Sequence, residues 1–167
     1  YSPAGRLPVT FPKSLDDLPP FNDYAMAGRT YRYADAEPLY PFGYGLSYTT
    51  FEYGEVKLSS PTMTADEELD VSVTIRNTGA YDGDEVVQLY VRDRAGSLTR
   101  PVRELKAFRK IRLDPGETAR VEFHLYADDL AFHGRDGRRR AEPGEFDLWI
   151  GGDSRASLGA AFTLTPA

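Results

Sequence analysis

Hydrophobic and polar residues alternate along the chain from about residue 48 onward, in short runs separated by turn residues. Between residues 69 and 75, Leu, Val, Val and Ile alternate with Asp, Ser and Thr, and the turn residues Asn-Thr-Gly follow at 77–79. A period of two places every second side chain on the same face of a strand. The pattern therefore predicts β-strands, each with one apolar face to bury.

The same pattern recurs at intervals of roughly a dozen residues. The expected strands are residues 51–58, 69–75, 87–91, 105–113, 121–125, 146–150 and 158–164, with a small hairpin at 130–141. Two packed antiparallel sheets would bury all of these apolar faces. We therefore expect an all-β sandwich in which no helix is longer than a turn or two.

Residues 1–47 show no helical or alternating period and contain seven prolines, which predicts irregular or extended backbone. Aromatic residues are nevertheless frequent in this segment: Phe11, Phe21, Tyr24, Tyr31, Tyr33, Tyr40, Phe42 and Tyr44. Because aromatic side chains bury large areas, we expect this arm to pack along a neighbouring domain, either its own sandwich or one outside this chain. The predicted boundary separates residues 1–47 from 48–167. Since the chain opens without Met or a targeting pattern, we expect it to be a piece of a larger protein.

Composition narrows the class of protein. Hydrophobic residues make up 41% and charged residues 28% of the 167 positions, the balance of a folded globular chain. The net charge of −6 disfavours nucleic acid as a partner, and no apolar run approaches the roughly 20 residues that a membrane helix needs. The absence of Cys excludes disulfides, thiolate metal sites and a Cys nucleophile.

The sequence offers no catalytic constellation. Adjacent acidic residues occur at 16–17, 67–68 and 128–129, but neighbours on a strand point to opposite faces and nothing nearby would desolvate a carboxylate. The two histidines, His124 and His133, lack a third ligand at metal-like spacing. We therefore expect no catalytic residue, no metal site and no cofactor in this chain.

Two aromatic features are candidates for binding. In the cluster Tyr31, Arg32 and Tyr33, the rings could stack on a sugar and the guanidinium could donate to its hydroxyls. These residues are candidates for a substrate cleft, and the alternative is an aromatic arm docked on a scaffold. If the apolar residues of 146–150 face the core, Trp149, the only Trp, lies on the outer face of its strand. There it either contacts another domain or packs under the chain's own loops.

Several longer motifs resemble those of one enzyme family. Residues 38–51 (PLYPFGYGLSYTTF) resemble the segment that precedes the C-terminal fibronectin type III-like domain of family-three glycoside hydrolases, the β-glucosidases and β-xylosidases. Residues 83–91 (GDEVVQLYV) and 100–108 (RPVRELKAF) look like the interior of that domain, and residues 5–12 (GRLPVTFP) resemble the end of the α/β sandwich domain before it. The resemblance covers essentially the whole chain, with its motifs in the right order.

The resemblance implies a retaining, exo-acting β-glycosidase that hydrolyses terminal non-reducing β-D-glucosyl or related residues. In that family an Asp nucleophile lies on a TIM-like barrel domain and a Glu acid/base on the α/β sandwich domain. Neither motif occurs here, so the chain alone is not expected to be active. Residues 48–167 would form the fibronectin type III-like (immunoglobulin-like) antiparallel sandwich, and residues 1–47 the end of the α/β domain and a linker arm.

The implied role is accessory: the chain would brace the two catalytic domains, which are its expected partners. The whole enzyme would bind a β-linked glycoside as its substrate. The residues expected at inter-domain contacts are Phe11, Tyr40, Phe42, Tyr44 and Trp149. The rival hypothesis is a free-standing carbohydrate-binding or adhesion module that stacks sugars on Tyr31, Tyr33 and Trp149. Sugar specificity is not readable from this segment. Secreted, periplasmic and cytosolic compartments stay open, with the first two favoured.

Overall fold

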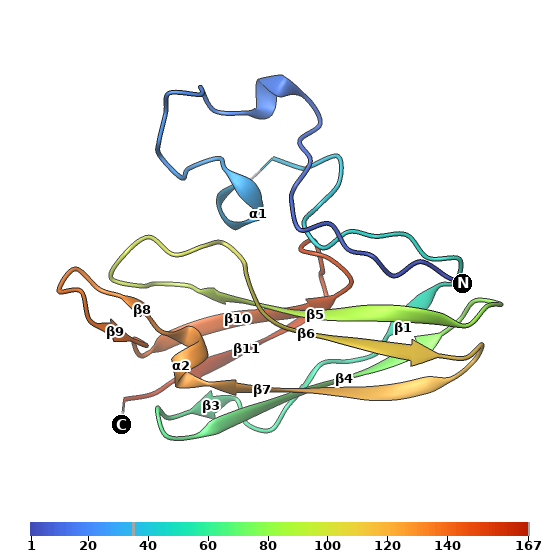
Figure 1. Ribbon diagram of the computed structural model, residues 1–167. Coiled ribbons are helices and arrows are strands. Elements are labelled where there is room, and N and C mark those ends of the chain that lie inside the picture. The colour runs from blue at the N-terminus through green and yellow to red at the C-terminus, as the bar shows by residue number, and fades with distance from the viewer. Residues whose placement is uncertain (35, 167) are drawn as a thin grey trace.

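The computed structural model describes residues 1–34 and 36–166 and contains two layers of strands with the N-terminal arm lying over one face (Figure 1). The helical turns are η1 (Leu15–Asp17), α1 (Thr30–Tyr33) and α2 (Ala127–Leu130). The strands are β1 (Phe51–Tyr53), β2 (Lys57–Leu58), β3 (Thr62–Met63), β4 (Glu68–Asn77), β5 (Gly83–Asp93), β6 (Glu104–Leu113), β7 (Thr118–Tyr126), β8 (Phe132–His133), β9 (Arg139–Arg140), β10 (Gly144–Gly151) and β11 (Gly159–Leu164). In the described part of the chain the helical turns are three or four residues long, far short of a membrane-spanning helix.

The strands form two packed sheets and a separate hairpin. In the first sheet β4 pairs with β7 on one side and with both β1 and β2 on the other. The second sheet has the order β3-β11-β10-β5-β6 and is antiparallel except where β3 meets β11. The β8–β9 hairpin occupies the predicted position at 130–141. The prediction of an all-β antiparallel sandwich is confirmed.

The predicted first strand, residues 51–58, is broken into β1 and β2. Tyr53 pairs with Ile75 of β4, whereas Lys57 pairs with Ser72 of β4. The chain therefore advances four residues from Tyr53 to Lys57 while β4 advances only three. The extra residue is accommodated as a bulge around Gly54, whose amide donates to the carbonyl of Thr74 at 2.8 Å. A continuous alternation in sequence therefore conceals a one-residue shift in register.

The hydrophobic core lies between the two sheets. The apolar residues of the alternating run at 69–75 are all at most 2% exposed, as period-two geometry requires. The other core-facing residues of the long strands are Val87, Leu89, Val91, Leu113, Val121, Phe123, Leu125, Phe146, Leu148, Ile150, Phe162 and Leu164. Burial of this apolar surface is the main driving force for the sandwich.

Asn77 ties one end of the two sheets together. Its side chain is fully buried at the end of β4. The amide nitrogen donates to the carbonyls of Tyr81 at 2.8 Å and Leu113 at 3.0 Å. The amide oxygen accepts from the hydroxyl of Thr49 at 2.6 Å and the backbone amide of Gly79 at 3.1 Å. The side chain thus connects the end of one sheet to the end of β6 in the other.

We predict that Asn77→Ala lowers the free energy of unfolding by about 3 kcal/mol, because the buried carbonyl of Leu113, the partly buried carbonyl of Tyr81 and the buried hydroxyl of Thr49 lose their partner. Chemical denaturation followed by circular dichroism measures the change. Thr74→Ala, on the exposed side of the same strand, is the matched control and should stay within about 0.5 kcal/mol of the parent. Equal effects of the two substitutions would contradict the role assigned to Asn77.

Candidate functional site

Strand β5 is buried on both faces. Its core-facing side packs between the sheets, while Gln88 and Tyr90, on the opposite face, are 3% and 0% exposed. The outer face of an antiparallel sandwich sheet ordinarily faces water. Here the N-terminal arm lies over that face, as the blue and cyan ribbon above β5 and β10 shows (Figure 1). The candidate functional site is this junction between arm and sandwich.

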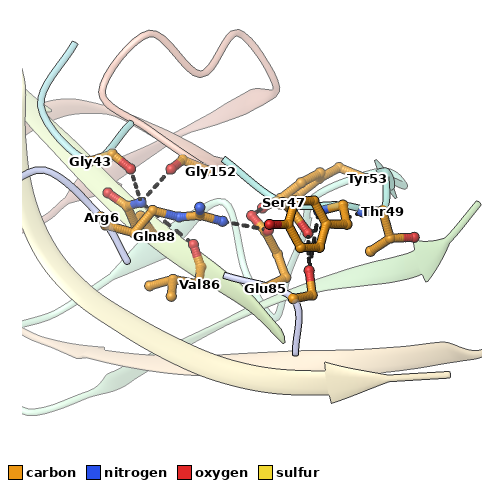
Figure 2. A network of polar contacts seen from close by, with 11 residues as sticks. Arg6, Gly43, Ser47, Thr49, Tyr53, Glu85, Val86, Gln88 and Gly152 are labelled. Carbon is orange, nitrogen blue, oxygen red and sulfur yellow. Dashed lines mark hydrogen bonds and ion pairs between the residues drawn. The ribbon is translucent and has the colours of Figure 1, made fainter. Parts of the chain in front are cut away.

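The side-chain amide of Gln88 connects three parts of the chain. Its nitrogen donates to the carbonyl of Gly43 in the arm at 3.2 Å and to that of Gly152 in the loop after β10. Its oxygen accepts from the hydroxyl of Tyr90 at 2.5 Å. Figure 2 shows the amide pointing at the two glycine carbonyls. A buried amide with all of these partners fixes the arm at a defined place on β5.

Glycine is the only residue type that fits at position 43, against the side chain of Gln88. Its φ of +84° is a left-handed conformation, and a Cβ built there would lie 2.2 Å from the side-chain oxygen of Gln88. A side chain would therefore introduce both backbone strain and a clash with the buried amide. The close approach of the arm backbone depends on this glycine.

A buried ion pair makes the second attachment of the arm. Arg6, near the start of the arm, donates to Glu85 of β5 at 2.6 Å, and the two side chains are 13% and 5% exposed. The other carboxylate oxygen accepts from the hydroxyl of Tyr53 at 2.6 Å. Burial, reinforced by the charge of Glu85, raises the pKa of Tyr53 far above its usual range, so the phenol stays protonated as a donor. Both ends of the carboxylate are thus paired (Figure 2).

The arm itself is held by backbone hydrogen bonds between two of its segments. The amide of Leu7 donates to the carbonyl of Tyr44 at 2.9 Å, and that of Gly43 donates to Leu7 at 2.8 Å. Phe11 and Tyr40 form an isolated antiparallel bridge. From this ladder the carbonyl of Phe42 accepts from the amide of Ser154 at 2.8 Å. Residues 7–11 and 40–44 therefore form a base that is bonded to the sandwich.

The residues predicted for a substrate cleft, Tyr31, Arg32 and Tyr33, all lie in α1. Tyr31 stacks on Phe42 with ring centroids 4.3 Å apart and meets Tyr90 edge to face at 6.0 Å, while its hydroxyl accepts from the amide of Leu105 at 3.2 Å. Arg32 pairs with Glu104 at 3.5 Å. These contacts hold the arm on the sandwich. Contact of Tyr31, Arg32 or Tyr33 with substrate stays a prediction.

The residues predicted for inter-domain contacts fall into two groups. Phe11, Tyr40 and Tyr44 form an aromatic cluster: Phe11 meets Tyr40 edge to face at 6.2 Å, and Tyr40 lies 5.1 Å from Tyr44. The first two remain exposed. Phe42 and Trp149 are instead half-buried within the chain, Phe42 by its stacking on Tyr31. Their contact with another domain stays a prediction.

Trp149 lies on the outer face of β10, between the buried Leu148 and Ile150. The guanidinium of Arg103 lies 4.0 Å from the centre of its ring system, a cation–π contact. One nitrogen of Arg103 donates to the carbonyls of Ser154 and Ala156, at 2.6 and 2.7 Å. The ring is therefore covered by a side chain of the same chain.

A cluster of ionisable side chains on the outer face of the other sheet was missed by sequence reasoning. His124 of β7 lies directly opposite Asp70 of β4, and its Nδ1 is 2.7 Å from the carboxylate of Asp70 and in contact with that of Glu68. The ring nitrogen of His124 and the carboxylate oxygens of Glu68 and Asp70, the atoms that could bind a metal ion, lie within 4.8 Å of one another. All three residues are exposed. Spacing along one strand cannot reveal a group that forms across two strands.

The buried network around Gln88 and Glu85 was also absent from the sequence analysis. Alternation with Val87 and Leu89 places Gln88 on the outer face, where a polar residue is expected to be solvated. The sequence carries one sign that the outer face of this strand is covered: Tyr90, a large aromatic residue, stands at another outward position. The amide of Gln88 and the carboxylate of Glu85 are both paired within the chain, so the junction fixes the arm in place.

We predict that Gln88→Ala lowers the free energy of unfolding by about 3 kcal/mol or more, because the carbonyls of Gly43 and Gly152 and the hydroxyl of Tyr90 lose their partner. Chemical denaturation measures the loss. Arg109→Ala, an exposed position on the neighbouring strand β6, is the control and should change the value by less than about 0.5 kcal/mol. A Gln88→Ala chain as stable as this control would contradict the anchoring role.

We predict that the pKa of His124 lies above its usual 6.5, because the hydrogen bond to Asp70 and the charge of Glu68 favour the protonated ring. The stabilisation from this contact is then complete below the unfolded pKa of about 6.5 and is lost as the pH rises through the raised folded pKa. An NMR titration of the His124 ring measures the shift. Asp70→Asn should lower the pKa, and no change in this variant would refute the assigned cause.

Two family descriptions match this chain. Residues 1–48 match the glycosyl hydrolase family 3 C-terminal domain, and residues 85–154 match the fibronectin type III-like domain. Among curated relatives, a periplasmic β-glucosidase of Salmonella typhimurium is 43% identical over 98% of this chain and 23% of its own length. A putative β-xylosidase of Formosa agariphila is 46% identical over 92% of this chain and 20% of its own length.

Solved structures give the same result. A β-glucosidase from Erythrobacter marinus superimposes with a TM-score of 0.85 and 40% identity, over 98% of this chain and 22% of its own. β-Glucosidase 3B from Thermotoga neapolitana gives a TM-score of 0.83 and 38% identity, over 98% and 25%. The chain thus spans about a quarter or less of these relatives. It belongs to the family-three glycoside hydrolases, as a C-terminal segment that carries their fibronectin type III-like domain.

Proposed function

We propose that this chain is the accessory C-terminal part of a retaining β-glycosidase that acts on terminal β-D-glucosyl or related residues, and that it braces the catalytic barrel and α/β sandwich domains. The relatives carry the names β-glucosidase and β-xylosidase, which supports a β-linked glycoside as the substrate of the whole enzyme. The chain would contribute structure and no catalytic group.

The observation that carries this proposal is the exposure of large apolar side chains on the outer part of the arm. Leu15, Phe21 and Tyr24 are 84%, 98% and 92% exposed. They belong to residues 15–24, in the blue segment of the arm that lies away from the strands (Figure 1). Exposed apolar groups gathered on one segment are typical of a surface that another body covers. With roughly three quarters of the relatives' length outside this chain, we infer that the catalytic domains provide the cover.

The firm base of the arm supports the same role. Residues 7–11 and 40–44 are bonded to each other and to the sandwich, so the outer part is presented from a fixed position. Binding then costs less ordering entropy than binding through a free tail. We propose that the aromatic cluster of Phe11, Tyr40 and Tyr44 extends the contact surface, and that the arm ends and the sandwich begins at residues 47 and 48.

The rival role, a free-standing sugar-binding module, has less support. A stacking platform needs open ring faces. The ring of Tyr31 is packed against Phe42 and Tyr90, and that of Trp149 is covered by Arg103. Tyr33 alone of the three proposed rings is left for a sugar, which favours the bracing role.

We predict that Phe21→Ser combined with Tyr24→Ser lowers the melting temperature of the full-length enzyme, because the burial of each ring against the catalytic domains, worth about 2 kcal/mol, is lost. The kcat on an aryl β-glucoside should stay within about twofold of the parent value. Scanning calorimetry and steady-state kinetics measure both quantities. In the 167-residue chain alone the same substitutions should leave the melting temperature unchanged, since the rings are already exposed there.

Tyr81→Ser, at an exposed position in the turn between β4 and β5, is the control in the full-length enzyme. An arm variant that melts at the same temperature as this control would count against the bracing role. A large fall in kcat without a fall in melting temperature would point to a direct part in catalysis and would also contradict it.

A further inference from the structure

Three side chains that can bind a metal ion meet on the outer face of the first sheet, which lies on the side of the sandwich away from the arm (Figure 1). Asp70 of β4 stands directly opposite His124 of β7, and Glu68 comes two residues before Asp70 on the same strand. Residues two apart on a strand share a face, so both carboxylates reach the same imidazole. The function proposed above makes no use of this cluster.

A single ring nitrogen serves two carboxylates in this cluster. The Nδ1 of His124 lies 2.7 Å from Oδ1 of Asp70 and is also in contact with Oε1 of Glu68. An imidazole nitrogen carries at most one proton, so the two carboxylates share one donor. In the described part of the chain, neither carboxylate forms an ion pair with a lysine or an arginine. A divalent cation in place of the shared proton would be attracted by two negative charges at once.

The donor set of two carboxylates and one imidazole favours a divalent transition metal. Imidazole suits Zn²⁺, Cu²⁺ and Ni²⁺, whereas Ca²⁺ and Mg²⁺ prefer larger sets of oxygen ligands. Zn²⁺ is often held by three protein ligands, with water in the remaining position. Ligand atoms around a tetrahedral ion lie roughly 3.4 Å apart, so the pair of His124 and Asp70, now at 2.7 Å, has to open by less than about 1 Å. Exposed side chains can make this adjustment.

The fold fixes the strands that carry these ligands and orients one of the carboxylates. β4 and β7 pair without a shift in register, and Leu69 and Leu125, on the inner face beside the cluster, are 0% and 1% exposed. The hydroxyl of Tyr126 donates to Oε2 of Glu68 at 2.7 Å, while Oε1 contacts His124. Hydrogen bonds from outer groups of this kind orient metal ligands and raise affinity. Tyr126 is therefore a positioning residue for Glu68.

We propose that Glu68, Asp70 and His124 bind a divalent transition-metal ion, with Zn²⁺ as the ion that suits the donor set best. The ion would join β4 to β7 through their side chains, in addition to the backbone ladder. Because it binds the folded chain, it would stabilise the sandwich by mass action. Spacing along the chain did not indicate this site, since Asp70 and His124 are 54 residues apart in the sequence and meet only across two strands.

The composition of the chain provides a matched control. It contains two histidines and no cysteine, and the second histidine, His133, is exposed on β8. We expect calorimetric titration of the untagged 167-residue chain with Zn²⁺ to show saturable binding of a single ion, and Zn²⁺ to raise the melting temperature. Loss of an outer hydrogen bond costs about tenfold or more in metal affinity, so His124→Ala and Asp70→Asn should each cost at least as much. His133→Ala and Glu52→Gln, an exposed carboxylate elsewhere on the same sheet, should leave the affinity unchanged.

Two further measurements locate the ion. The ring signals of His124 in NMR spectra should shift when Zn²⁺ is added, while those of His133 stay in place. Tyr126→Phe removes the hydroxyl that orients Glu68 and should weaken Zn²⁺ binding about tenfold. Circular dichroism checks that each variant is folded, which we expect because all of the substituted side chains are exposed.

Several results would overturn the proposal. These are no saturable binding of Zn²⁺, an affinity that His124→Ala leaves unchanged, or an equal loss of affinity in His133→Ala. Binding of Ca²⁺ or Mg²⁺ as tight as that of Zn²⁺ would refute the assignment to a transition metal. An unchanged affinity in Tyr126→Phe would contradict the positioning role of its hydroxyl. Since none of these readouts is glycosidase activity, they succeed or fail independently of the proposed bracing role.

Discussion

The buried amide of Gln88 is the constraint on which the rest of the junction depends. An amide removed from water must find partners for both its nitrogen and its oxygen. Here those partners are the carbonyls of Gly43 and Gly152 and the hydroxyl of Tyr90. They come from the arm, from the loop after β10 and from β5 itself, so satisfying one side chain brings three segments into register. The positive φ of Gly43 and the buried Arg6–Glu85 pair follow from the same close approach.

This junction determines how the chain can act on a larger enzyme. Because the base of the arm is bonded to the sandwich, the exposed residues around Phe21 and Tyr24 are presented from a fixed platform. A partner docked there would be coupled to the whole sandwich and its core. Bracing would therefore depend on the arm staying in place.

Most of the sandwich could be predicted from sequence because its strands obey a local rule. The run at 69–75 alternates strictly, and its apolar residues are buried as expected. The features that sequence analysis missed depend on contacts between residues that are far apart in the sequence. Gln88 reads as a solvated outward residue until the arm covers it, and His124 meets Asp70 only through the pairing of β4 with β7. The bulge near Gly54 is likewise set by register, which a single strand does not encode. Trp149 could be placed on the outer face, but its cover by Arg103 could not.

Native-state hydrogen exchange on the 167-residue chain tests most directly whether arm and sandwich form one cooperative unit. The informative amides are those of Leu7, Gly43 and Ser154, which bond within the arm or between loop and arm. If the Gln88 network holds the junction, they should exchange with the same free energy of opening as the central amides of β5. Exchange at these positions that is faster by orders of magnitude would mean that the arm leaves a folded sandwich, and would contradict this account.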